Sequence, residues 1–302
     1  MNELYTINKS TLDDIGSALR EASNTTEKFA VSNIGDKIRE LASGGGENKL
    51  AKLVDKSITE ITAADLQGVT SIGTYCFVSC KELTNVELAD SITNIGTYSF
   101  QSCSNLMSVK MPSALQKIDA YAFRECSNLK SIIFNEDIIL KTIASYAFNR
   151  CSSLTSITIP DSVTSISSHS FSECANLTSA TIGRGLTTIA SDAFYNCKKL
   201  IDVTIPDNVT QLGNNAFSNC SGLQNITIPS SVTSIGNGTF INCYALNHIK
   251  VLATTPPSIQ SNTFSGVPST CIYEVPAASV ETYKAATNWS AKASQIVASE
   301  EF

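Results

Sequence analysis

Apolar residues in this chain return at a fixed interval over most of its length. Phe, Cys and Leu recur in that order, three residues apart, and successive Cys positions are 23 residues apart except for one step of 25 between Cys126 and Cys151. The Phe positions are Phe77, Phe100, Phe123, Phe148, Phe171, Phe194, Phe217, Phe240 and Phe264. Eight complete cycles in phase identify an internal repeat. Such a period is typical of solenoids and other repeat architectures.

Each repeat contains two apolar clusters with different spacing, as residues 154–176 illustrate. Ile157 and Ile159 alternate with polar residues, which predicts a short strand with one buried face. Val163 and Ile166 follow a turn and predict a second short extended segment. Residues 170–174 are too few for an ordinary helix, so we expect a helical turn there with Phe171 and Cys174 directed inward. One unit cannot bury its own apolar edge, whereas stacked units can.

The stacked units predict a rod of coils. With parallel strands ~4.8 Å apart, about nine coils give a core roughly 40 Å long. The two additional residues of the long repeat lie between Phe134 and Leu140, where Asn135, Glu136 and Asp137 are expected to bulge at the edge of a coil. Either a tolerated surface insertion or a functional loop explains this bulge.

The order L-x-x-I-x-I-P, V-x-x-I and A-F-x-x-C within each period resembles the BspA-type leucine-rich repeats, over residues 66 to about 251. The resemblance implies a right-handed leucine-rich repeat solenoid, built mainly from short parallel β-strands with helical turns. It also implies a surface protein that binds host or matrix proteins. Residues 253–289 resemble the closing segment of such proteins, so residues 252–302 are expected to form a last partial repeat and a C-terminal cap. Within them, residues 275–286 predict a last strand and a capping helix. Such a cap shields the final apolar edge.

The first 65 residues depart from the repeat. Residues 1–42 predict a small helical hairpin, with Leu12, Ile15 and Leu19 on one helix face and Ser32 at the start of a second helix. Residues 43–48 form a Gly-rich linker, and residues 49–65 are expected to form the N-terminal cap of the solenoid. The hairpin is similar to short leaders on phage and prophage structural proteins. Packing on the cap, or homo-oligomerisation through residues 1–42, is the alternative.

Charge and composition narrow the function. Charged residues make up 16% of the chain, and the net charge is −6 with a pI near 5.0. An acidic chain without a basic run argues against nucleic acid as a partner. No apolar stretch is long enough to insert into a membrane. The N-terminus does not read as a secretion signal, so either export uses another route or a leader has been removed.

The cysteine pattern predicts a packing role in the core and not a disulfide framework, a metal site or a catalytic site. Eight of the ten cysteines occupy one repeat position, so we expect a reduced column inside the core. Stacked parallel Cβ atoms lie near the strand spacing, beyond the distance that a disulfide requires. A 23-residue spacing does not match zinc ligand pairs. No catalytic, phosphate-binding or dinucleotide-binding motif is present, so we expect no enzyme activity, no cofactor and no metal.

Two rows of outward positions are the candidate binding surfaces. The first, here called the strand face, comprises Asn85, Glu87, Ser108, Lys110, Ser131, Ser156, Thr158, Ser179, Thr181, Asp202, Thr204, Asn225, Thr227, His248 and Lys250. It offers short hydroxyl groups for a protein or a glycan, or it serves only strand propensity and solubility. The second row, here called the tyrosine stack, comprises Tyr75, Tyr98, Tyr121 and Tyr146, with His169 next in phase. Contact with a partner and ring stacking within the protein both explain it.

Together these features predict a non-enzymatic, adhesin-like protein that binds a macromolecule, at the cell surface or outside the cell. The alternative is a structural component of a phage or prophage tail or fibre, attached through the N-terminal hairpin and associated with the virion.

Overall fold

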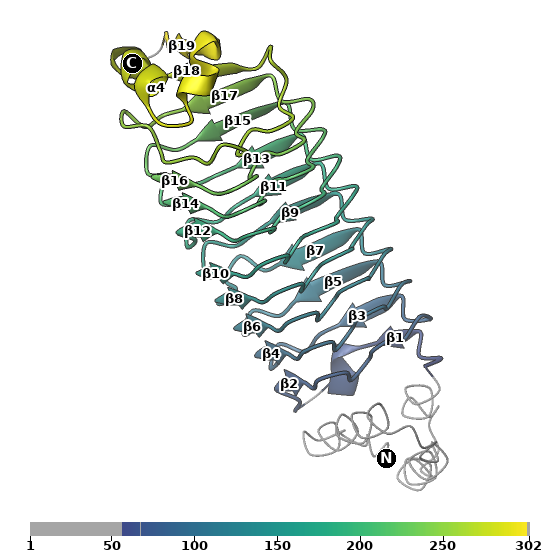
Figure 1. Cartoon of the computed structure of the whole chain (residues 1–302). Helices are drawn as coiled ribbons and strands as arrows, with labels where there is room; N and C mark the ends of the chain where they lie inside the picture. The colour runs from purple at the N-terminus through teal and green to yellow at the C-terminus, as the bar shows by residue number, and fades with distance from the viewer. Residues whose placement is uncertain (1–55, 67, 301–302) are drawn as a thin grey trace, which may run out of the picture.

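The protein is a rod of stacked coils that ends in a small C-terminal cap (Figure 1). The computed structural model describes residues 56–66 and 68–300. The predicted hairpin of residues 1–42, the linker of residues 43–48 and the first part of the expected N-terminal cap lie outside the described residues. Residues 56–66 contribute a short strand and the 3-10 helix η1 (Ala63–Leu66) to the first coil.

Each coil contributes a first strand to one side of the rod, as the alternation of apolar residues predicts. These strands are β1 (Glu60–Ile61), β3 (Asn85–Glu87), β5 (Ser108–Met111), β7 (Ser131–Phe134), β9 (Ser156–Thr158), β11 (Ser179–Thr181), β13 (Asp202–Thr204), β15 (Asn225–Ile228) and β17 (His248–Val251). They pair in parallel with a shift of one repeat, so that Ser156 lies beside Ser179 and Ser179 beside Asp202. The inward residue of each, such as Ile157, is buried.

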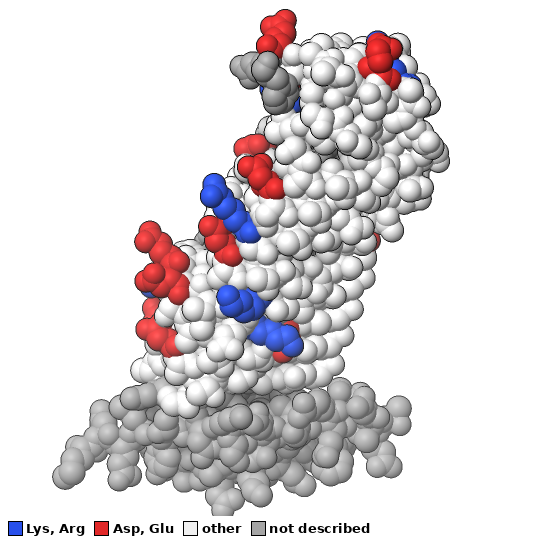
Figure 2. Space-filling view, turned by 90° about the vertical axis from the view of Figure 1, so that its left-hand side faces the viewer, with Lys and Arg blue, Asp and Glu red and all other residues white. Residues whose placement is uncertain are grey.

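A second, two-residue strand in each coil lines another side of the rod. These strands are β2 (Ser71–Ile72), β4 (Asn94–Ile95), β6 (Lys117–Ile118), β8 (Thr142–Ile143), β10 (Ser165–Ile166), β12 (Thr188–Ile189), β14 (Gln211–Leu212) and β16 (Ser234–Ile235). Figure 2 shows this face, on which charged residues gather mainly along one edge. Lys117 is the only charged residue within the second strands that the structure describes.

The segment around Phe and Cys is a series of tight turns and not a regular helical turn. In the coil of residues 168–174, the N–H groups of His169, Phe171 and Glu173 donate to carbonyl groups of the following coil. The N–H of Ser172 instead donates back to the carbonyl of His169, 3.2 Å away. This alternation requires a left-handed backbone at His169 and Glu173, whose φ angles are both 62°. Two left-handed residues therefore recur in each coil.

The inward side of these turns forms the centre of the core. The repeated Phe rings stack along the rod with centroids 5.0 to 5.7 Å apart. Each Cys thiol from Cys103 to Cys243 donates to the carbonyl of the Phe in the preceding coil, at 3.0 to 3.3 Å. All ten cysteines are buried as thiols, and the eight at the repeated position form the predicted column in the core.

The two-residue insertion forms an exposed turn at a coil edge, as expected. Glu136 and Asp137 are exposed, and the N–H of Ile138 donates to the carbonyl of Asn135. The sheet of first strands is interrupted between β7 and β9 and again between β13 and β15, where no residue is inserted, whereas β8 pairs with both β6 and β10. The insertion therefore leaves the stacking of the second strands intact.

The C-terminal cap closes the end of the core. Strand β18 (Ile272–Val275) pairs with β17, and β19 (Ile296–Ala298) pairs with β18, both in parallel. Between them lie η2 (Ala277–Ser279), α4 (Val280–Ala285) and η3 (Ser290–Gln295). The predicted strand and capping helix are present, whereas η3 and β19 were not predicted. Trp289 is buried beneath this cap and donates from Nε1 to the carbonyl of Pro257, 2.8 Å away.

Candidate binding surface

The strand face lies on the outward side of the first strands. All of its predicted residues are exposed or half-buried, and neighbours in the row lie side by side through the parallel register, such as Asn225 and His248. The residues are spread along the length of the rod (Figure 1). The row therefore offers a long series of hydroxyl and amide groups without bringing them together around one point.

The C-terminal end of the strand face carries a cluster that the sequence did not reveal. The carboxylate of Glu274 on β18 accepts hydrogen bonds from His248 and Lys250 on β17, at 2.8 and 3.2 Å, and from the hydroxyl of Ser299. The bond from Ser299, together with those from Lys250 and His248, lowers the pKa of Glu274. Glu274 was missed because β18 lies after the last full repeat, where the consensus no longer identifies outward positions.

The tyrosine stack is a column of rings in contact. Centroids of successive rings from Tyr75 to Tyr146 lie 4.6 to 4.8 Å apart, with interplanar angles of 10° or less. His169 continues the column at 4.5 Å from Tyr146. Since each inner ring is covered on both faces by its neighbours, the column presents ring edges and hydroxyl groups to the surface. Ring stacking, one of the two interpretations, is therefore present.

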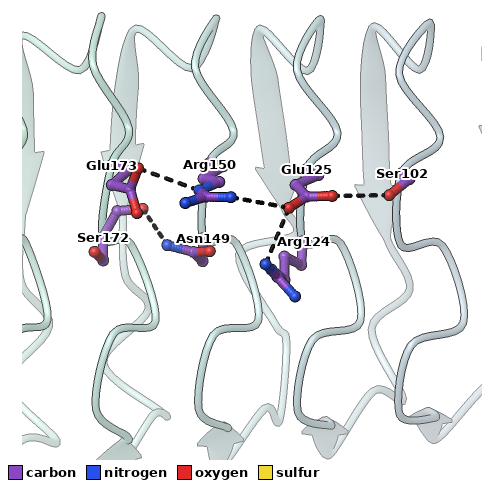
Figure 3. Close-up of polar contacts among 7 residues, drawn as sticks. All are labelled: Ser102, Arg124, Glu125, Asn149, Arg150, Ser172 and Glu173. Atoms are coloured by element: carbon purple, nitrogen blue, oxygen red, sulfur yellow. Dashed lines mark hydrogen bonds and ion pairs between the residues drawn. The ribbon is translucent and has the colours of Figure 1, made fainter.

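A second row beside this column holds an ion-pair ladder, which is formed by Glu125, Arg150 and Glu173 (Figure 3). Arg150 donates from Nε to Glu173 at 3.1 Å and from Nη1 to Glu125 at 3.2 Å. Glu125 also accepts from Arg124 at 3.0 Å and from the hydroxyl of Ser102 at 3.0 Å. The hydrogen bond to Glu173 raises the pKa of Arg150. With Arg124 included, the two carboxylates and the two guanidinium groups balance in charge.

Sequence reasoning missed this ladder although its signal is periodic. Glu125, Arg150 and Glu173 each precede the repeated Cys, so they occupy the same position in three successive coils. Residues in one phase of a solenoid become neighbours, and alternating charges in that phase predict ion pairs.

A shallow groove of about 440 Å³ runs beside the ladder and is here called the ladder groove. Its polar side is formed by the three ladder residues and Asn196. The adjoining row contributes only the small residues Ser127, Ser152 and Ala175, followed by Lys198 in the next coil. Because the side chains of this adjoining row are small, the groove stays open along the rod axis beside the longer ladder side chains.

The chemistry of these surfaces is hydrogen bonding. Across residues 56–66 and 68–300, no group of three or more His, Cys, Asp or Glu side chains is placed to hold a metal ion. Burial raises the pKa of the core thiols, that of Cys174 to about 12, so they remain protonated. Within the same ranges, no helix has the length and apolar character needed to cross a membrane.

Comparison with known proteins agrees with the repeat architecture. The sequence model of the BspA type leucine rich repeat region matches residues 53–141 and 141–271, with six copies of the repeat. No curated protein shows significant similarity to the chain.

One solved structure shows the same fold, and two further ones are similar proteins. A leucine-rich repeat protein from Bacteroides ovatus is 25% identical with a TM-score of 0.55, over 81% of this chain and 70% of that one. The T. pallidum leucine rich repeat protein is 30% identical with a TM-score of 0.48, over 51% of this chain and 72% of that one. A leucine rich cell surface protein from Faecalibacterium prausnitzii is 20% identical with a TM-score of 0.39, over 72% and 77% of the two chains. The repeats, the solenoid of parallel strands and the family match over most of the chain together place this protein in the BspA-type leucine-rich repeat family.

Proposed function

We propose that this protein is a non-enzymatic interaction module of a bacterial surface or secreted assembly, and that it binds a macromolecule, protein or glycan, through the outward rows of its coils. Membership of the BspA-type family supports a binding role. The observation that carries the proposal is the distribution of residue types at the two left-handed positions of each coil.

The first left-handed position changes character along the rod. It holds Tyr75, Tyr98, Tyr121, Tyr146 and His169 in the first five coils, and then Asp192, Asn215 and Gly238, all with φ between 53° and 62°. Gly adopts this conformation freely and Asn, Asp and His are enriched in it, whereas most other L-residues lose about 1–2 kcal/mol in it. The N-terminal half therefore keeps four tyrosines at positions where the C-terminal half has residues suited to the backbone.

The second left-handed position repeats this division. It holds Ser79, Ser102, Glu125, Arg150 and Glu173, and then Asn196, Asn219 and Asn242. Ion pairs between partly exposed side chains contribute only about 0–1 kcal/mol each, so the ladder gives no clear gain in stability over three Asn residues. Side chains retained against a backbone preference indicate selection for surface chemistry. This is our reason for placing a binding role on the N-terminal half of the rod.

Location and binding test the proposal together. Antibody raised to the repeats is used to label intact producer cells and, separately, particles from an induced culture. The purified full chain is then applied to immobilised matrix proteins and mucins. Labelled cells and saturable binding are expected.

Three results would count against the proposal. Labelled particles with unlabelled cells would support the phage structural role instead. Label only in broken cells would contradict a surface or secreted location. A hydrolytic activity in the pure protein that requires one residue would contradict the non-enzymatic role.

A further inference from the structure

The ladder groove retains hydrogen-bonding groups that the protein itself does not use. Arg150 has five N–H donors, of which two are engaged by Glu125 and Glu173, so three remain. Its side chain is 49% exposed. Within residues 56–66 and 68–300, the carboxamide of Asn196 forms no hydrogen bond and the ammonium group of Lys198 forms no ion pair. Donors and acceptors thus stand side by side along the groove.

Charge compensation in the groove defines the ligand further. The two carboxylates of the ladder are already paired with Arg150, and Glu125 also with Arg124. A strongly anionic ligand would be repelled by Glu125 and Glu173, and a strongly cationic ligand would be repelled by Arg150 and Lys198. A neutral ligand that both donates and accepts hydrogen bonds matches this arrangement.

The groove lacks the features of a protein interface. Protein hot spots are apolar or aromatic anchors in well-packed pockets. Most residues that line this groove are polar, and its one apolar side chain is the methyl group of Ala175. The large hydrophobic side chains that are most exposed, among them Ile133, Ile201 and Tyr244, are not part of its lining. A protein partner would therefore bind more favourably to other parts of the rod.

We infer that the ladder groove binds a linear, neutral, hydroxyl-rich polysaccharide that lies along the rod axis, with Arg150 as its central contact. Each coil adds one planar hydrogen-bonding group, namely carboxylate, guanidinium, carboxylate and carboxamide in turn. Planar forks of this kind bond two neighbouring acceptors or donors at once, as adjacent sugar hydroxyl groups provide. Repetition at about the strand spacing suits a ligand that is itself repetitive. The inference rests on the proposed function and gives it a ligand class.

Affinity electrophoresis of the full chain tests the inference. Native gels contain, one at a time, hydroxyethylcellulose, xylan, galactomannan or dextran, and migration is compared with gels without polysaccharide. We expect at least one polymer to retard the wild-type chain. In that polymer Arg150→Gln should bind about tenfold or more weakly, because it loses charge-assisted hydrogen bonds. Ser152→Trp, which fills the groove beside Arg150, should bind as weakly.

Arg184→Gln is the matched control, since Arg184 is exposed in another part of its coil and lies outside the groove lining. It should migrate as the wild type does. Circular dichroism verifies that each variant is folded. If Ser152→Trp fails to fold, Arg150→Gln alone decides. Retardation that is equal in wild type and Arg150→Gln would overturn the inference, as would no retardation in any gel.

The outcomes separate this inference from the broader proposal. Suppose that the wild-type chain binds immobilised mucin or matrix protein, and that periodate oxidation of the target's glycans and Arg150→Gln leave this binding unchanged. The proposed function would then stand, with a protein ligand, and the glycan inference would fail. Binding to neither polysaccharides nor proteins would count against both.

Discussion

Single residues in this protein are constrained by the backbone conformation of their repeat position. Ser79 and Asn196 occupy the same phase of the repeat, with φ of 58° and 61°. Only Asn is suited to that conformation, because its short amide side chain tolerates a left-handed backbone. Exchanging the residue types of Ser79 and Asn196 therefore tests how much the left-handed backbone contributes to the free energy of unfolding.

Exchanging these two residue types should shift stability in opposite directions. We expect Ser79→Asn to raise the free energy of unfolding by about 0.5–1 kcal/mol, and Asn196→Ser to lower it by a similar amount. Urea denaturation followed by circular dichroism measures both. If both substitutions changed the free energy of unfolding in the same direction, the left-handed positions would not be strained.

The buried thiols predict a loss of stability in alkali. Burial raises the pKa of eight cysteines, those of Cys174 and Cys243 to about 12, while the pKa of a thiol in the unfolded chain is about 8.5. The unfolded chain therefore loses protons first, and stability that is complete below this pH declines as pH rises toward the folded pKa. The urea midpoint should be lower at pH 9.5 than at pH 7. Cys197→Ala, which removes one titrating thiol, should reduce the difference, and an unchanged midpoint in the wild type would refute the explanation.

Among the strands, β18 is linked to its neighbours by one carboxylate in addition to the backbone pairing with β17 and β19. Glu274 joins β18 to His248 and Lys250 of β17 and to Ser299 beyond β19. Its lowered pKa means that the ionised form stabilises the folded state. This contribution is present above the unfolded pKa of about 4.3 and is lost as pH falls through the lower folded value.

Glu274→Gln should therefore destabilise the protein by about 1 kcal/mol at pH 7. The difference from wild type should shrink below pH 4, where the native carboxylate takes up its proton. Glu87→Gln serves as the control, because Glu87 is an exposed glutamate on the same row of strands. A pH-independent difference would indicate a packing effect and not a charge effect.

The elements differ in how far the sequence predicts them. The core positions of Phe171 and Cys174 follow from their place in the repeat alone. A residue type that returns at the same position of every coil stacks on its equivalents in the neighbouring coils. The left-handed turns do not follow from the repeat, because Tyr and Arg carry no local signal for positive φ, which only the Asn, Asp and Gly residues of the later coils suggest. β19 escapes prediction because its three residues lack the consensus, and it becomes a strand only by pairing with β18.

At the scale of the whole molecule, each coil is stabilised mainly by its two neighbours, so the ends determine where opening starts. The cap holds the C-terminal end through buried aromatic residues. Tyr283 donates from its hydroxyl to the carbonyl of Ala253 at 2.7 Å and packs edge-on against Trp289. Trp289 is the only tryptophan of the chain, so its fluorescence reports on the cap alone.

Tyr283→Phe should open the cap before the coils. Loss of the buried hydrogen bond removes about 1 kcal/mol from the cap. The midpoint of the fluorescence transition in urea should therefore fall more than the midpoint measured by circular dichroism. Tyr244→Phe, at a tyrosine that is 61% exposed, should leave both midpoints unchanged. A common shift of both signals in Tyr283→Phe would mean that cap and coils unfold as one unit.

The change of residue types at the left-handed positions also gives the rod a direction in folding. Turns built on Asn, Asp and Gly, as in the coils around Asn215 and Asn219, form with less backbone strain than those built on Tyr, Glu and Arg. A solenoid grows by adding coils to a formed edge. We therefore expect the first stable coils to arise in the C-terminal half and to serve as a template for the strained coils that follow. During synthesis the N-terminal half emerges first, so it would wait for the later coils before it folds.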